Sequence, residues 1–250
     1  MEKDLQNKTV VITGGATGIG YAIADKFLNK RAKVVILLDI DEEKGAEAVK
    51  TLVTKYGDNK AVFYKCDVTK DLEAVYEKLI HNFKAIDVLA NNAGILNDLT
   101  VKKTMEINVV ALLEWSFKFW EHMRTDKSGK GGTIINLSSI YGFRFDQYLP
   151  VYQASKSAVM AFTKSLGHSY NLTRFGVRVV AICPGFTKTN IVIDMKTWIP
   201  EVQEEFLTFT KQQLWQEAEA VGEAAVNVFE TAESGTAWLI EGAKPITEVF

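Results

Sequence analysis

The sequence predicts a doubly wound α/β fold, with a mostly parallel sheet of about seven strands and helices on both faces. Short runs rich in Val and Ile alternate along the chain with stretches of helical periodicity. These runs are continuously apolar and do not alternate between apolar and polar residues. Strands of that kind are buried on both faces, as in parallel sheets that helices cover.

Seven runs are expected to be strands, and helical stretches separate most of them. The expected strands are residues 9–13, 33–38, 61–66, 86–91, 133–138, 177–183 and 236–241. The expected helices are residues 18–30, 42–56, 70–83 and 101–125, a helix that begins near Val151, and residues 217–231. The first three helices have about the length that a right-handed crossover between parallel strands needs.

One long segment, at about 186–215, interrupts this rhythm. It carries large apolar residues such as Phe186, Met195, Trp198 and Phe206. Loops of this length inside a compact domain are usually functional, and an apolar one suits a lid over a substrate pocket. The alternative is an ordinary amphipathic helix or a subunit contact.

The composition limits the classes of partner. A chain of 250 residues is expected to form one domain over 1–250. Charged residues make up 24% of it and the net charge is −2, which argues against nucleic acid or an anionic membrane as partner. The first residues lack a secretory signal, and no apolar stretch reaches the roughly 20 residues of a membrane span. A small-molecule partner is therefore expected.

The cysteines and histidines predict neither a disulfide framework nor a metal site. Cys66 and Cys183 are the only cysteines, and they form no CxxC or zinc pattern. A reducing cytoplasm fits this usage best. His81, His122 and His168 have no ligand spacing, so no metal is expected.

A glycine-rich turn, with Gly14, Gly18 and Gly20, joins the first expected strand to the first expected helix. Glycines at such a turn allow a tight bend, a close backbone approach to a pyrophosphate, and close packing of helix on strand. The helix N-terminus then offers backbone N–H groups to the anion. The turn thus predicts a dinucleotide site.

An acidic residue, Asp39, ends the second expected strand, 19 residues after Gly20. A carboxylate there can accept hydrogen bonds from the adenosine ribose and repels a 2′-phosphate. Thr17 stands where a phosphate-selective protein can carry Lys or Arg. Both residues favour NAD over NADP. The alternative is that Asp39 only caps the helix that begins near Asp41.

At this point the sequence resembles the short-chain dehydrogenase/reductase family, whose fold is of the Rossmann type, over essentially the whole chain. The glycine turn has that family's TGxxxGxG spacing, with Ile19 between the last two glycines. The other matching motifs follow in order: "CDVT" at 66–69, "NNAG" at 91–94, Asn108, "NLSS" at 136–139, "YQASK" at 152–156 and "PGFTKT" at 184–189. The last motif and the closing "SGTAWLIEGAKP" are similar to insect-type alcohol dehydrogenases and 15-hydroxyprostaglandin dehydrogenases.

The resemblance implies further contacts with the cofactor NAD. It places Asp67 and Val68 at the adenine, and Tyr152 and Lys156 beside the nicotinamide, with Lys156 on its ribose. It also places Asn91, Ala93 and Gly94 next to the cofactor at the end of the fourth strand. The nicotinamide carboxamide is expected at Pro184, Gly185, Thr187 and Thr189.

Tyr152 and Lys156 lie four residues apart, so a helix places both on one face. A phenol with a pKa near 10 is a poor base at neutral pH, but a nearby ammonium favours the phenolate. Tyr152 then becomes a plausible general acid and base for hydride transfer. By the family spacing, Ser139 is expected to bind the substrate oxygen and Asn108 to complete a proton relay. Taken alone, a tyrosine and a lysine at this spacing are more often a half-buried helix face with a snorkelling lysine, and it is Ser139, Asn108 and the glycine turn that favour a catalytic pair.

These observations predict an NAD-dependent enzyme that acts on a small apolar alcohol or the matching carbonyl compound. The alternatives are a catalytically silent dinucleotide-binding sensor or scaffold, or an NADP-dependent carbonyl reductase. The resemblance also implies a homodimer or homotetramer, with the helices at 101–125 and 151–170 in the interface.

Overall fold

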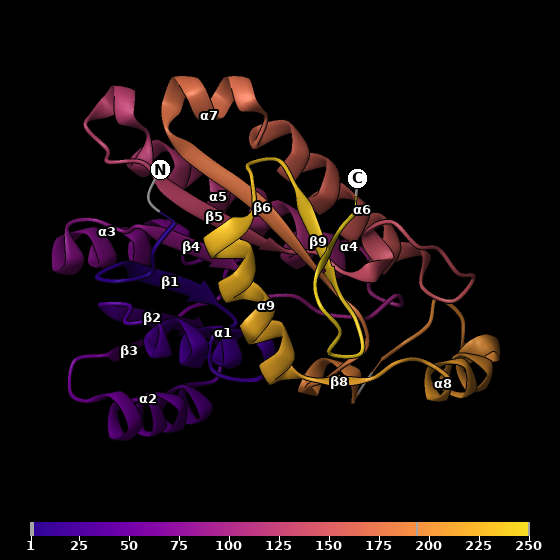
Figure 1. Ribbon diagram of the computed structural model, residues 1–250. Helices are drawn as coiled ribbons and strands as arrows, with labels where there is room; N and C mark the ends of the chain where they lie inside the picture. The colour runs from indigo at the N-terminus through magenta and orange to yellow at the C-terminus, as the bar shows by residue number, and fades with distance from the viewer. Residues whose placement is uncertain (1–2, 194, 250) are drawn as a thin grey trace.

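The centre of the molecule is an eight-stranded sheet with the strand order β10-β9-β6-β5-β4-β1-β2-β3 (Figure 1). The computed structural model describes residues 3–193 and 195–249. Seven strands of this sheet run parallel, and β10 pairs antiparallel with β9 at one edge. The expected doubly wound α/β fold is therefore confirmed, with one more strand than expected. The extra strand falls in the polar C-terminal tail, where two residues carry too little pattern to predict it.

The strands lie close to their expected positions. The strands of the main sheet are β1 Thr9–Thr13, β2 Val34–Asp39, β3 Ala61–Lys65, β4 Val88–Asn91, β5 Gly132–Leu137, β6 Val177–Pro184, β9 Ala237–Ile240 and β10 Thr247–Glu248. A second, two-stranded sheet pairs β7, Thr187–Lys188, with β8, Gln216–Glu217, in parallel. This small sheet joins the beginning of the long segment at 186–215 to the residues that follow its end.

The α-helices connect the strands and cover both faces of the main sheet. They are α1 Gly18–Asn29, α2 Glu42–Tyr56, α3 Leu72–Phe83, α4 Val101–Met105, α5 Leu112–Met123, α6 Pro150–Leu166, α7 Ser169–Phe175, α8 Gln203–Lys211 and α9 Ala218–Thr231. Among the described residues, five further helices are of 3-10 or π type: η1 Glu106–Ala111, η2 Thr125–Lys127, η3 Ile140–Gly142, η4 Asn190–Val192 and η5 Pro200–Val202.

Neighbouring residues of each strand point to opposite faces of the sheet and fill two separate cores. Val10 and Ile12 of β1 pack with α1, α2 and α9, which lie on one face. Val11 packs with α3 and α5 on the other face. Figure 1 shows α9 in front of the sheet, close to α1, and α8 projecting at the lower right, away from the strands. No helix among the described residues is long and apolar enough to span a membrane.

The expected helix at 101–125 is interrupted. It begins as α4, continues as the π-helical segment η1 from Glu106 to Ala111, and returns to α-helix in α5. Short π segments inside helices are rare and occur frequently at functional sites. Asn108 lies in this segment and is buried.

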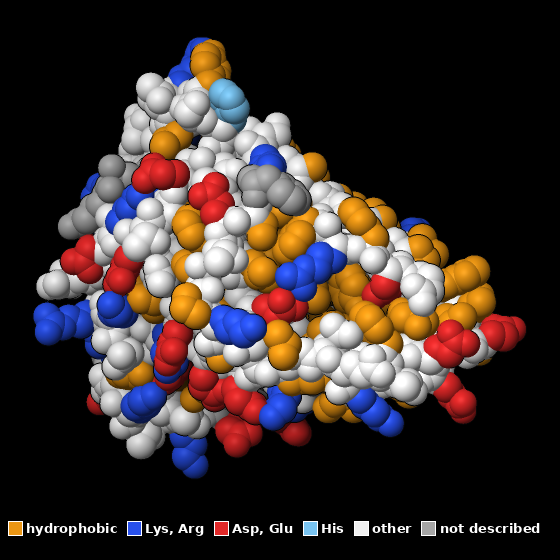
Figure 2. Space-filling model, turned by 45° about the vertical axis from the view of Figure 1, so that its right-hand side comes forward, with side chains coloured by type: hydrophobic (Ala, Val, Ile, Leu, Met, Phe, Trp, Pro, Cys, Tyr) orange, Lys and Arg blue, Asp and Glu red, His pale blue; other side chains and the backbone are white. Residues whose placement is uncertain are grey.

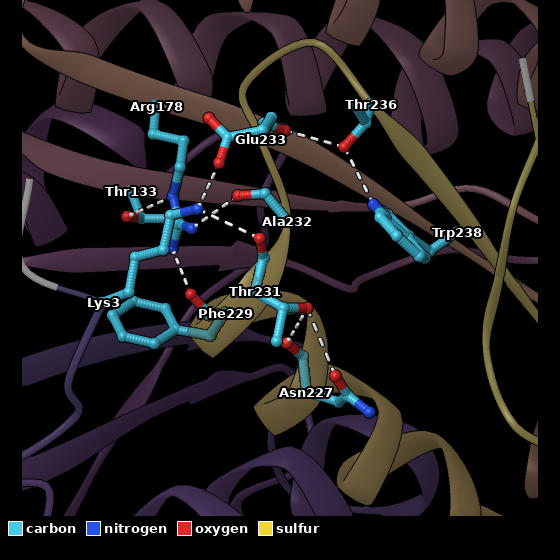
Figure 3. Close-up of polar contacts among 10 residues, drawn as sticks. All are labelled: Lys3, Thr133, Arg178, Asn227, Phe229, Thr231, Ala232, Glu233, Thr236 and Trp238. Atoms are coloured by element: carbon cyan, nitrogen blue, oxygen red, sulfur yellow. Dashed lines mark hydrogen bonds and ion pairs between the residues drawn. The ribbon is translucent and has the colours of Figure 1, made fainter.

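A buried arginine on β6 holds the C-terminal end of α9 (Figure 3). Arg178 donates from Nη2 to the Phe229 carbonyl at 2.7 Å and from Nη1 to the Ala232 carbonyl at 2.9 Å. Its guanidinium also lies over the Phe229 ring. These bonds satisfy carbonyls that a helix end leaves without partners. Nearby, Lys3 donates to the Thr231 carbonyl and so ties the N-terminal segment to the same helix end.

Replacing Arg178 should lower the stability of the fold. Arg178→Met keeps the side-chain length but leaves buried carbonyls unpaired, so we expect the free energy of unfolding to fall by about 2–4 kcal/mol. Urea unfolding followed by circular dichroism measures the loss. Arg174→Met on the exposed side of α7 is the control, with an expected change within about 0.5 kcal/mol. Equal losses for both variants would contradict the capping role of Arg178.

Candidate active site

The expected site residues gather at the carboxyl ends of the parallel strands. In the strand order, β1 lies between β4 and β2. The chain runs from β1 to β2 and β3 on one side and then crosses to β4 on the other side, so the direction of winding changes at β1. Doubly wound sheets bind ligands outside the carboxyl ends of the strands at such a switch point. The glycine turn follows β1, Asp39 ends β2, and the Asn91–Gly94 segment begins at the end of β4.

The glycine turn has the geometry that a phosphate group requires. Gly14 has φ +62° and Gly18 has φ +55°, a region that side-chain-bearing residues rarely adopt. A Cβ atom on Gly20 would collide with the Gly14 carbonyl. Thr17 is the N-cap of α1 but makes no side-chain cap, so the first backbone N–H groups of α1, including that of Ile19, remain available to an anion. The residues present therefore fit a dinucleotide phosphate.

Asp39 lies against this turn. Its carboxylate accepts hydrogen bonds from the Ala16 backbone N–H at 3.1 Å and from the Asp41 backbone N–H at 3.2 Å. The cap of α2 is Asp41, whose side chain accepts from the Lys44 backbone N–H at 3.0 Å. The alternative that Asp39 only caps this helix is therefore wrong.

The segment after β4 is fastened to the glycine turn. Asn92 donates from its side chain to the Thr13 and Gly14 carbonyls at 3.1 and 2.9 Å. The backbone N–H groups of Asn92 and Ala93 donate to the Thr13 hydroxyl. Thr13 and Asn92 were not among the expected site residues, although both lie inside the matched motifs. They hold the two halves of the expected cofactor site together.

Three further residues expected to contact the cofactor are Asp67, Val68 and Asn91, and the side chains of Asp67 and Asn91 form hydrogen bonds within the protein. Asp67 accepts from Thr69 and Lys70, and the Lys70 ammonium holds the pKa of the Asp67 carboxyl down at about 2. Val68 lines a small cavity together with Asn91 and Ala93. The Asn91 side chain donates to Ser116 and Asn136 inside the protein. Cofactor contacts of Asp67, Val68 and Asn91 stay predictions.

The segment that follows β6 approaches the glycine turn. A Cβ atom at Gly18 would lie 3.1 Å from Cγ2 of Thr189. Thr187 is buried and donates its hydroxyl to the Gly185 carbonyl at 2.9 Å, while Gln216 donates to the same hydroxyl. The Thr187 side chain thus supports the turn that begins at Pro184, whereas Thr189 faces the glycines.

Tyr152 and Lys156 lie one turn apart on α6, and both are buried, with exposed fractions of 7% and 4%. The Lys156 ammonium lies 5.6 Å from the centroid of the Tyr152 ring and donates to the Leu137 carbonyl at 2.9 Å. Ser139, just beyond the end of β5, lies next to the Tyr152 phenol. A Cβ atom at Gly94 would lie 3.6 Å from the Lys156 Nζ. The structure therefore brings Tyr152, Lys156, Ser139 and Gly94 together.

Burial shifts the two titratable groups in opposite directions. It raises the pKa of Tyr152 to about 12, although a hydrogen bond with Ser139 counteracts this. It lowers the pKa of Lys156 to about 8. Both shifts favour the neutral form, because a low-dielectric site disfavours any single charge. Perturbed acids and bases of this kind cluster at catalytic sites.

Asn108 connects three parts of the site. Its side-chain oxygen accepts from the Ile95 backbone N–H at 2.8 Å, and its side-chain nitrogen donates to the Ile95 carbonyl at 2.9 Å and to the Ser155 hydroxyl at 3.1 Å. It therefore links η1, the segment after Gly94, and α6. The expected proton relay through Asn108 stays a prediction.

Sequence reasoning missed Asp98, which holds the first turn of α6. This residue is 3% exposed and accepts from the Val151 and Tyr152 backbone N–H groups at 2.7 and 3.0 Å. Its own backbone N–H donates to the Lys196 carbonyl at 3.0 Å. One acidic residue therefore joins α6 to the segment at 186–215. No spacing rule points to it, because it caps a helix that begins more than fifty residues later.

The segment at 186–215 packs over Tyr152 through apolar side chains. The cluster includes Tyr141, Tyr148, Tyr152, Phe186, Met195 and Phe206. The ring centroids of Tyr148 and Phe206 are 5.4 Å apart, and those of Phe186 and Trp215 are 5.3 Å apart. Tyr141 and Tyr148 both come from the loop after Ser139. Phe145 is 74% exposed and Phe143 packs against a different cluster, so neither ring belongs to this one.

Comparisons with known proteins agree with this geometry. A family model described as short chain dehydrogenase matches residues 8–200. The 15-hydroxyprostaglandin dehydrogenase [NAD(+)] of Macaca fascicularis is 38% identical over 190 residues, which are 75% of this chain and 71% of that protein. The human protein of the same name is 37% identical over the same shares of both chains. Alcohol dehydrogenase 2 of Ceratitis cosyra is 32% identical over 239 residues, 92% of this chain and 90% of that protein.

Solved structures share the fold. A levodione reductase structure superposes with a TM-score of 0.80 over 95% of this chain and 97% of that one, at 24% identity. A 3-ketoacyl-(acyl-carrier-protein) reductase from Brucella melitensis gives a TM-score of 0.79 over 95% and 98% of the two chains, also at 24% identity. Family model, relatives and fold lead to one conclusion: the chain belongs to the short-chain dehydrogenase family of oxidoreductases.

Proposed function

We propose that the protein is an NAD-dependent dehydrogenase that interconverts a hydrophobic primary or secondary alcohol and the matching aldehyde or ketone. One observation carries the proposal. A buried tyrosine, lysine and serine meet at the same edge of the sheet as a glycine turn whose neighbouring carboxylate is Asp39. The whole chain, 1–250, would then be one catalytic domain.

Tyr152 acts as the general acid and base. In oxidation, the Tyr152 phenolate accepts the proton of the substrate hydroxyl, and in reduction the phenol returns it. Ser139 holds the substrate oxygen near the phenol, and Lys156 places a positive charge close to the phenolate. The nicotinamide, when bound, supplies the hydride acceptor and, in its oxidised form, a further positive charge. These charges offset the burial that holds the pKa of Tyr152 at about 12.

The choice of NAD rests on Asp39 and on the relatives. A carboxylate at the end of β2 can bind the ribose hydroxyls and repels an additional phosphate. The 15-hydroxyprostaglandin dehydrogenases are named as enzymes of NAD(+). The same carboxylate argues against the alternative of an NADP-dependent carbonyl reductase. The presence of Tyr152, Lys156, Ser139 and Asn108 argues against a silent sensor or scaffold.

The lid supports an apolar substrate. The side chains that pack around Tyr152 are largely aromatic and aliphatic. Figure 2 shows hydrophobic side chains gathered on the right-hand part of the visible face of the molecule. Because Tyr152 is only 7% exposed, a substrate reaches its hydroxyl group when parts of the segment at 186–215 move aside. Burial of an apolar substrate would then replace the contacts that the lid side chains make with one another.

Two further properties belong to the proposal. Phe117 of α5 is 50% exposed, and its ring meets that of Phe162 on α6 with centroids 5.4 Å apart. This apolar face suits the expected homodimer or homotetramer. Cys66 and Cys183 are free thiols, which suits the cytoplasm.

Removal of the phenolic hydroxyl should abolish turnover and spare the binding of the cofactor. We expect Tyr152→Phe to lower kcat/KM for apolar alcohols by about 10²- to 10⁴-fold, because the proton acceptor is lost. NADH absorbance measures turnover, and NADH fluorescence measures binding. Tyr170→Phe on the distant helix α7 is the control and should retain activity. Full activity of Tyr152→Phe would disprove the role of Tyr152, and a native protein that binds NADH but oxidises no alcohol would favour the sensor alternative.

Removal of the carboxylate near the ribose should relax the preference for NAD. We expect Asp39→Ala to raise the affinity for NADPH relative to NADH by about tenfold, because an additional phosphate is no longer repelled. Titration of each reduced cofactor by fluorescence gives both dissociation constants. Asp41→Ala, which removes the cap of α2, is the matched control and should leave the ratio unchanged. Tighter binding of NADPH than NADH by the native protein would contradict the assignment of Asp39.

A further inference from the structure

A buried carboxylate, that of Asp98, lies at the start of α6. The side chain is 3% exposed, and Asp98 forms no ion pair among the residues that the structure describes. A charge in the protein interior is costly unless it is paired or hydrogen-bonded, so a buried carboxylate without a counter-ion needs an explanation. Its two oxygens bind backbone N–H groups of α6.

These two hydrogen bonds form the whole side-chain cap of α6. Oδ2 of Asp98 accepts from the Val151 backbone N–H at 2.7 Å, and Oδ1 accepts from the Tyr152 backbone N–H at 3.0 Å. The residue at the N-cap position, Leu149, makes no side-chain cap, and Pro150 at the first helical position has no N–H. Asp98 therefore caps this helix from outside it.

The cap acts on the backbone of the expected general base itself, because Tyr152 is the third residue of α6. Two hydrogen bonds from one carboxylate to neighbouring N–H groups fix both the position and the rotation of the helix start. A shift of the cap would therefore move the phenol relative to Ser139. Displacement of a reacting group by about 1 Å can cost about 100-fold in rate.

Asp98 is itself held by two other parts of the fold. Its backbone N–H donates to the Lys196 carbonyl at 3.0 Å, in the segment at 186–215. The preceding residue, Asn97, forms a parallel bridge with Lys196, and its carbonyl accepts from the Thr104 hydroxyl of α4 at 2.6 Å. Thr104 is buried. The carboxylate thus stands on a fixed support.

We propose that Asp98 is a positioning residue of the dehydrogenase reaction, which fixes the backbone of Tyr152 and thereby the place of its phenol beside Ser139. This inference rests on the proposed function. It assigns to Asp98 an effect on turnover and not on binding, because the cap supports the proton-transferring group and leaves the glycine turn untouched.

The charge of Asp98 gives this role a signature in the pH profile. Burial is the main cause of the high pKa of Tyr152, and the Asp98 carboxylate raises that pKa further. Lys156 and Tyr141 also lie next to the Tyr152 ring, and Asp146 lies close to Asp98. A neutral side chain in place of Asp98 leaves these groups unchanged and should lower the pKa of Tyr152.

The first test removes the charge and one of the two acceptors. At the pH of the rate plateau, we expect Asp98→Asn to lower kcat for an apolar alcohol by about 10- to 100-fold, with KM and the Kd of NADH within about twofold of native. In oxidation the acidic limb of the pH profile should move to lower pH, because the phenolate forms more easily. A native kcat or an unmoved acidic limb would overturn the proposal.

Two further variants separate position from charge. Asp98→Glu keeps the charge and both acceptors but adds a methylene, so its kcat should lie between those of Asp98→Asn and the native protein, with the acidic limb at the native pH. Asp87→Asn is the matched control, since Asp87 also accepts from a backbone N–H, that of Thr9 at the start of β1. It should keep the native kcat and pH profile. A comparable loss in Asp87→Asn, or native kcat in Asp98→Glu, would contradict the positioning role.

Hydrogen exchange separates failure of this inference from failure of the proposed function. If the native protein oxidises no alcohol, the dehydrogenase proposal fails, and the support of Tyr152 is judged by amide exchange in the presence of NADH. The Val151 and Tyr152 amides should exchange at least about tenfold faster in Asp98→Asn than in the native protein. Asp98→Glu replaces Asp98→Asn in this measurement if the latter does not fold. Unchanged exchange at both amides would overturn the support of Tyr152 by Asp98.

Discussion

Burial of Tyr152 and Lys156 at the start of α6 is the constraint on which the site depends. A phenolate and an ammonium are each costly in a low-dielectric site, so burial raises the pKa of one group to about 12 and lowers that of the other to about 8. At neutral pH the Tyr152 phenol is therefore protonated, while Lys156 still carries its charge for the most part, and further positive charge beside the phenol is needed to lower the pKa of Tyr152. The chain by itself thus holds an acid, and an oxidised nicotinamide would convert that acid into a base.

The surrounding loops hold this buried pair in place. Asp98 caps the first turn of α6 through the Val151 and Tyr152 backbone N–H groups, and its own N–H donates to the Lys196 carbonyl in the segment at 186–215. Asn108 joins η1 to Ile95 and Ser155. A shift of the segment at 186–215, of Ile95 or of α6 would therefore change the position of the Tyr152 phenol. Burial and the hydrogen bonds of Asp98 and Asn108 together hold the Tyr152 phenol in one geometry.

Much of this structure could be predicted from local sequence patterns. The features that could not be predicted depend on contacts between residues far apart in the sequence. Strands such as β1 and β6 were predicted within one residue, because continuous apolar runs in parallel sheets have few alternatives. The glycine turn and the spacing from Tyr152 to Lys156 are local as well. Asp98 acts on residues more than fifty positions away, and the π segment η1 depends on tertiary packing, so neither leaves a sequence signal. Phe145 is apolar but exposed, so hydrophobicity alone does not predict which aromatic side chains of this loop are buried.

The most direct test of this account is the titration of Tyr152 itself. Tyrosinate absorbance is recorded against pH for the native protein and for Tyr152→Phe, and the difference isolates one phenol. The account predicts a pKa of about 12 in the cofactor-free protein and a clear decrease at saturating NAD+. A pKa near the ordinary value of 10 without cofactor, or no change on addition of NAD+, would contradict it.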